Sequence, residues 1–112
     1  GAQRRDLLYV DDAIDAILAA ALRPEATGRV FNVSHDEALT LREIAEQVVA
    51  AAGAGSVELV PWPEEHAVID IGDFVSDASA ARAVLGWRAR TPFPEGIRRT
   101  LEFYRARREQ YL

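Results

Sequence analysis

The sequence contains no cysteine, no lysine and only two histidines. Without cysteine, neither a disulfide nor a thiolate metal site can form. The histidines, His35 and His66, stand far apart and lack the spacing of metal ligands, so no metal site is expected. Every basic residue is therefore an arginine, and 13 arginines stand against 18 acidic residues for a net charge of −5.

Long apolar runs and long basic runs are also missing. No segment approaches the roughly 18 apolar residues that cross a membrane, and no signal peptide is visible. No basic run is longer than the one at 105–108, which reads Arg-Ala-Arg-Arg, whereas a general nucleic-acid binder needs a basic face. We therefore expect a cytoplasmic protein that binds neither membranes nor nucleic acid.

The composition that remains is typical of a small globular domain. The chain has 112 residues, of which 49% are hydrophobic and 28% charged, with no internal repeat and no low-complexity linker. A domain of this size buries about two thirds of its unfolded surface, which is enough for a modest core. One domain is therefore predicted.

Helices are predicted where apolar residues recur every three or four positions or where a cap precedes a short segment. The predicted helices are residues 13–22, 41–52, 77–85 and 94–104. Asp11 or Asp12 is expected to cap the first of them. Thr40 followed by Glu43 has the capping-box pattern at the start of the second.

Short runs of β-prone side chains lie between these helices. The predicted strands are residues 7–10, 29–33 and 57–60. The expected fold class is therefore α/β, a small lobe of about four helices with several short strands. A loop at 34–36 reads Ser-His-Asp, but neighbours in sequence rarely converge in the geometry of a hydrolase triad, and none is predicted.

Residues 3–12 read Q-R-R-D-L-L-Y-V-D-D. This stretch resembles the motif G-x-Q-x-R-D-F-x-Y-V-D-D of the extended short-chain dehydrogenase/reductase family, which includes sugar-nucleotide epimerases, 4,6-dehydratases and decarboxylases. The likeness continues through residues 30–33, 40–49, 77–87 and 94–104. It implies that residues 1–112 are the sugar-nucleotide binding lobe, the C-terminal part of an extended Rossmann-type enzyme whose NAD(P)-binding half is absent upstream.

The resemblance also implies three substrate-binding residues, Arg5, His66 and Asp70. Arg5 matches the family's arginine that holds the diphosphate, while Asp70 matches an acid that bonds a ribose hydroxyl. A second family arginine is missing, and His66 or Ala67 stands in its place. From the residues alone, pairing of Arg5 with Asp6 or solvent is the favoured interpretation, because exposed ion pairs are common. His66 remains equally open as a partly exposed loop residue, and Asp70 as a solvated acid.

No catalytic or cofactor-binding residue is predicted in this chain. Its lack of lysine excludes the tyrosine–lysine pair that catalyses reactions in the family. The resemblance implies that the intact protein uses NAD or NADP on a UDP- or dTDP-sugar, as a 4-epimerase, 4,6-dehydratase or decarboxylase. The alternatives are a free-standing, non-enzymatic protein-interaction module and a binding lobe that has lost its ligand. Self-association through the helix at 13–22 is also expected.

Overall fold

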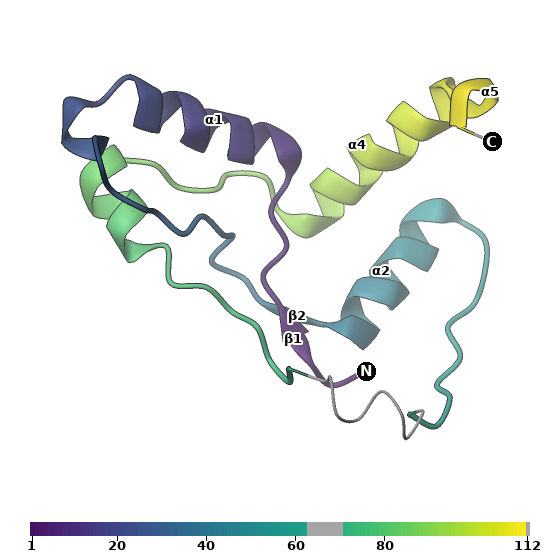
Figure 1. Ribbon diagram of the computed structural model, residues 1–112. Helices are drawn as coiled ribbons and strands as arrows, with labels where there is room; N and C mark the ends of the chain where they lie inside the picture. Colours follow the sequence, from purple (N-terminus) through teal and green to yellow (C-terminus); the bar gives the residue numbers. More distant parts are fainter. Residues whose placement is uncertain (63–70, 112) are drawn as a thin grey trace.

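The computed structural model describes residues 1–62 and 71–111. Its long helices are α1 (Val10–Ala21), α2 (Leu41–Ala52) and α4 (Phe93–Ala106). The shorter ones are a 3₁₀ turn (Pro24–Ala26), a π-helical turn (Ala81–Leu85) and α5 (Arg108–Tyr111). Figure 1 shows α1 beside the π-helical turn at one end of the molecule and α2 beside α4 at the other. None of the described helices has the length and apolar character needed to cross a membrane.

Two very short strands connect the two ends of the molecule (Figure 1). Strand β1 (Arg4–Arg5) pairs antiparallel with β2 (Leu39–Thr40), with Arg5 opposite Leu39. A single parallel bridge joins Arg5 to Phe74. The predicted strands at 7–10, 29–33 and 57–60 are wrong, because the structure pairs none of these segments with a neighbouring strand. β-prone side chains favour an extended backbone, but a strand exists only where a partner accepts its hydrogen bonds.

The predicted long helices are confirmed, and so is the capping box. Thr40 Oγ1 accepts the Glu43 N–H at 3.1 Å, while Glu43 Oε2 accepts the Thr40 N–H at 2.8 Å. The Thr40 hydroxyl also donates to Glu43 Oε2, at 2.8 Å. The bonds that the Thr40 N–H and hydroxyl donate to the carboxylate lower the pKa of Glu43. At the other end of α2, Gly53 takes the left-handed conformation, with φ of 71°, that glycine adopts without strain.

The predicted cap of α1 is wrong. Tyr9 occupies the capping position without a side-chain hydrogen bond, and Asp11 and Asp12 lie inside the first turn. The Asp12 carboxylate is instead buried, where its Oδ2 accepts the Thr91 N–H at 2.9 Å. Asp12 therefore ties α1 to the segment that leads into α4.

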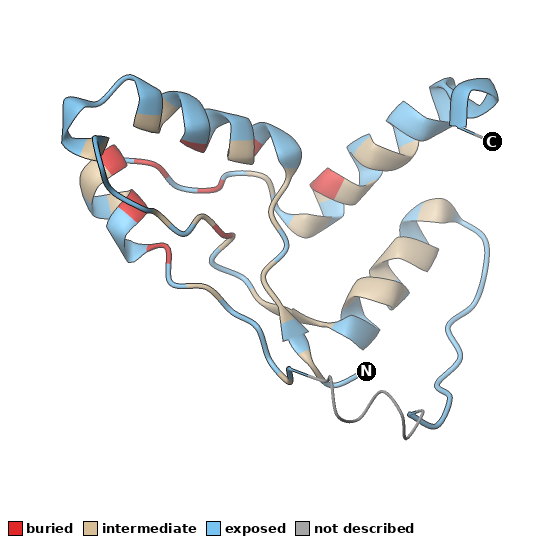
Figure 2. Ribbon diagram, in the orientation of Figure 1, coloured by how far each residue is buried: buried red, intermediate tan, exposed pale blue. Residues whose placement is uncertain are grey.

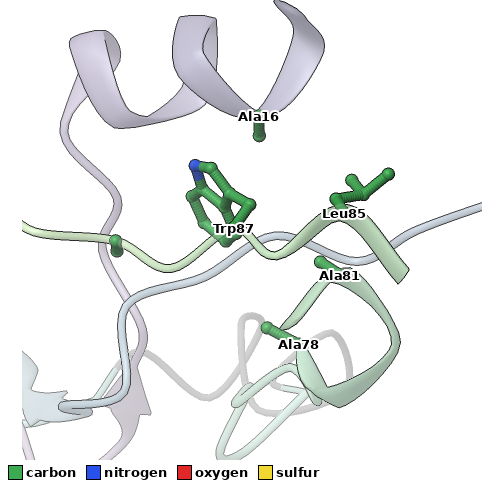
Figure 3. Packing of buried hydrophobic residues seen from close by; sticks show 6 residues of the cluster. Ala16, Ala78, Ala81, Leu85 and Trp87 are labelled. Carbon is green, nitrogen blue, oxygen red and sulfur yellow. The ribbon is translucent and has the colours of Figure 1, made fainter. Parts of the chain in front are cut away.

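The core is small and lies between α1 and the segment from 78 to 89 (Figure 2). Its buried apolar residues are Ala16, Ala78, Ala81, Leu85, Trp87 and Ala89. Trp87 is the largest of them, and its indole lies under α1 near Ala16 (Figure 3). Its Nε1–H donates to the carbonyl oxygen of Asp12 at 3.0 Å, so the one polar atom of the ring is satisfied.

Arg98 and Arg99 lie on the exposed side of α4, whereas Arg105 reaches α2, where its Nη2 donates to the carbonyl oxygen of Ala52 at 2.8 Å. Arg98 and Arg99 donate to the Glu95 carboxylate, and together they lower the pKa of Glu95 to about 2. Because these pairs are open to solvent, their contribution to stability is small. The opposite side of α4 packs against α2.

Replacing Thr40 with alanine should lower the free energy of unfolding by about 1 kcal/mol, because the first turn of α2 loses its side-chain cap. Urea denaturation followed by circular dichroism measures this change. Thr27→Ala is the matched control, since the Thr27 hydroxyl makes no hydrogen bond to the described residues. An equal loss in both variants would show that the cap is not the cause.

Candidate functional site

Arg5 on β1 is the centre of the candidate site. Its Nη1 donates to the carbonyl oxygen of Arg4 and to that of Gly72, both at 2.7 Å. Nη1 carries two hydrogens, and these two bonds use both. The remaining edge of the guanidinium, Nε and Nη2, makes no hydrogen bond or ion pair to residues 1–62 and 71–111. A guanidinium edge of this kind matches two oxygens of one phosphate group.

Hydrogen bonds from backbone N–H groups to carboxylate and carbonyl oxygens hold the segment 72–76 alongside β1 and so fix the surroundings of Arg5. The N–H groups of Arg4, Phe74 and Ser76 donate, in that order, to Asp73 Oδ1 at 2.8 Å, Arg4 O at 3.0 Å and Asp6 Oδ2 at 2.6 Å. The Asp6 carboxylate is therefore bonded to Ser76. The alternative in which Arg5 pairs with Asp6 is wrong, because the structure forms no ion pair between them.

The other two predicted substrate-binding residues, His66 and Asp70, lie outside the described residues. Their roles at the diphosphate and the ribose stay predictions. The structure adds Gly72, which the sequence reasoning missed as a member of the site. The available signal was a glycine between Ile71 and Asp73, a position that marks a turn of the backbone.

The Ser-His-Asp loop is not a catalytic triad. Ser34 is buried and donates to the carbonyl oxygen of Ser76 at 3.3 Å. His35 Nδ1 accepts the N–H of Glu37 at 3.1 Å, and Asp36 pairs with Arg82. Each member is engaged with a different neighbour. Over the described ranges, no three histidine, aspartate or glutamate side chains gather closely enough to hold a metal ion.

A separate hollow of about 180 Å³ lies between the linker that precedes α1 and the start of α4. Leu7, Tyr9, Phe93 and Ile97 are among its lining residues, which include no arginine, histidine, aspartate or glutamate. An apolar lining of this kind suits packing and does not suit a phosphate. This hollow is therefore separate from the guanidinium edge of Arg5.

Comparisons with known proteins find relatives that act on sugar nucleotides. The model of the NAD dependent epimerase/dehydratase family matches residues 1–34, which include Arg5. The UDP-glucose 4-epimerase of Mycolicibacterium smegmatis is 35% identical over 107 residues, a match that covers 94% of this chain and 32% of that protein. The dTDP-glucose 4,6-dehydratase of Streptomyces niveus is 35% identical over 112 residues, covering 96% of this chain and 31% of that protein.

Solved structures give the same result for the fold. The crystal structure of a UDP-glucose 4-epimerase with UDP-glucose from Thermotoga maritima superposes with a TM-score of 0.82 at 25% identity, covering 96% of this chain and 33% of that one. The resemblance read from the sequence and the α/β fold class are confirmed. This chain spans about a third of the length of the curated relatives it matches.

Proposed function

We propose that this chain belongs to the NAD-dependent epimerase/dehydratase family, whose model matches residues 1–34, and that it is the part of a sugar-nucleotide epimerase or dehydratase that binds the substrate. The observation that carries the proposal is the Nε–Nη2 edge of Arg5, which presents two aligned N–H donors suited to a diphosphate. The named activities of the relatives favour a UDP- or dTDP-sugar as the ligand. Residues 1–112 would then orient the substrate while other residues carry out the chemistry.

The proposal assigns the cofactor, NAD or NADP, to other parts of the intact protein. A dinucleotide site of the usual kind needs a strand that leads through a glycine-rich turn into a helix. In the described residues, both strands are two residues long, and β2 runs directly into α2 at the Thr40 cap. These residues do not fit a dinucleotide, and the chain has no lysine for the catalytic pair.

The cytoplasmic location expected from the sequence stays a prediction.

Titration calorimetry on the intact protein tests this function. UDP-glucose or dTDP-glucose should bind, and uridine, which lacks phosphates, should bind much more weakly. If neither sugar nucleotide binds, the proposed function is wrong. The alternative that the chain is a binding lobe that has lost its ligand would then be favoured.

The exposed side of α1 favours a second proposal, that the isolated chain pairs with another copy of itself. The exposed large apolar side chains of α1, with that of Leu22 just after it, are those of Val10, Ile14, Ile17, Leu18 and Leu22, exposed by 48% to 81%. Large apolar side chains gathered on the exposed side of a helix are normally covered by a partner. An antiparallel pairing would set exposed Asp11 and Asp15 at the start of one α1 against Arg23 beyond the end of the other.

Light scattering over a concentration series should therefore show a dimer of the 112-residue chain. Leu18→Glu should shift the equilibrium to monomer, because it puts a charge at the centre of the pairing surface. Leu59→Glu is the control, since Leu59 is also exposed, by 62%, but lies away from α1. A monomer at every concentration, or a dimer that survives Leu18→Glu, would contradict this proposal.

A further inference from the structure

The hydrogen bonds of Arg5 divide its guanidinium into an anchored part and a presented part. Nη1 is held between two carbonyl oxygens that belong to different segments of the chain, those of Arg4 and Gly72. A free arginine side chain loses considerable rotamer entropy when a ligand immobilises it. With Nη1 already anchored, Arg5 presents its Nε–Nη2 edge in one orientation before any ligand arrives.

The second anchor depends on the backbone conformation of Gly72. Its φ is +65°, in the left-handed region that side chains other than glycine rarely adopt. A Cβ built at Gly72 would have no atom of residues 1–62 and 71–111 within 4 Å, so none of these residues requires a glycine there for space. The requirement that these residues show comes from the backbone conformation. A residue that relaxes out of this conformation turns the peptide that carries the carbonyl group bonded to Arg5.

We propose that Gly72 is a positioning residue, whose carbonyl oxygen aims the Nε–Nη2 edge of Arg5 at the diphosphate of the substrate. The proposal rests on the proposed function for the identity of the ligand, but the anchoring itself does not. It also explains why lysine would be a poor substitute at position 5. Two of the three ammonium hydrogens would be taken by the same carbonyl groups, which leaves one donor in place of a fork.

Nuclear magnetic resonance tests the anchoring on the chain itself, without a ligand. In the parent labelled with nitrogen-15 arginine, the guanidinium of Arg5 should show hindered rotation, with its signals assigned from their loss in Arg5→Lys. Gly72→Ala should release this rotation. Gly72→Asn should largely preserve it, because asparagine adopts the left-handed region more readily. An Arg5 that rotates freely in the parent, or stays hindered in Gly72→Ala, would overturn the proposal.

Gly28→Ala is the matched control for backbone strain. Gly28 also has a positive φ, +71°, with nothing within 4 Å of a built Cβ, and it makes no contact with Arg5 in the structure. Gly28→Ala should leave the signals of Arg5 unchanged. Loss of hindered rotation in both alanine variants would mean that general destabilisation is the cause, and would overturn the proposal.

UDP binding by the intact protein tests whether the position of Arg5 affects the affinity for a diphosphate. Gly72→Ala should lower the affinity for UDP about ten-fold, which is the effect of misplacing a hydrogen bond to a charged group. The affinity for uridine should stay unchanged. An equal loss for UDP and uridine, or no loss for UDP, would contradict the positioning role. If the parent binds no UDP, the proposed function fails, while the rotation of Arg5 still decides whether Gly72 anchors it.

Discussion

Replacing Arg5 with alanine in the intact protein should weaken UDP binding by about ten-fold to more than one hundred-fold. The removed guanidinium edge would supply charge-assisted hydrogen bonding to the diphosphate worth about 1.5–3 kcal/mol in all. Arg5 is also anchored beforehand through Nη1, so little of this energy is spent on ordering the side chain. Titration calorimetry with UDP and a UDP-sugar measures the loss.

The control for this experiment is Arg108→Ala, which removes the same charge from α5 at the far end of the molecule (Figure 1). That variant should bind UDP as the parent does. Arg5→Lys should lose nearly as much affinity as Arg5→Ala, because a single ammonium does not reproduce two aligned N–H donors. Unchanged affinity in Arg5→Ala would show that the diphosphate binds elsewhere.

Replacing Trp87 with alanine should lower the free energy of unfolding by about 3–5 kcal/mol, the usual cost of removing a buried aromatic side chain. Trp87 is the largest member of a core that otherwise consists of alanines and one leucine. The total free energy of unfolding of a small domain is about 5–15 kcal/mol, so this loss could approach the whole of it. Urea denaturation followed by circular dichroism measures it.

Two further variants separate the contributions of Trp87. Trp87→Phe keeps an aromatic ring in the core but leaves the carbonyl oxygen of Asp12 without the indole donor, and it should cost less than alanine. Trp62→Ala serves as the control, because Trp62 is 51% exposed and should contribute much less. Equal destabilisation by Trp62→Ala and Trp87→Ala would contradict the assignment of Trp87 as the main core residue.

The sequence by itself determined the helices, because their signals are local. The apolar periodicity of α1 and α2 and the Thr40–Glu43 capping box depend on residues only three or four positions apart. The sequence likewise pointed to Arg5, since the resemblance rests on a contiguous motif that the family comparison matches. Both inferences needed no knowledge of where distant segments lie.

Only the tertiary structure decided which segments pair and what Arg5 contacts. Residues 7–10 have β-prone side chains, yet the strand forms at Arg4–Arg5, where Leu39 and Phe74 provide partners. The bond from Arg5 to Gly72 joins residues 67 positions apart. Likewise Asp12 bonds the N–H of Thr91, 79 positions away, and does not cap its own helix. A hydrogen bond depends on the position of both partners, and for distant residues folding alone sets that position.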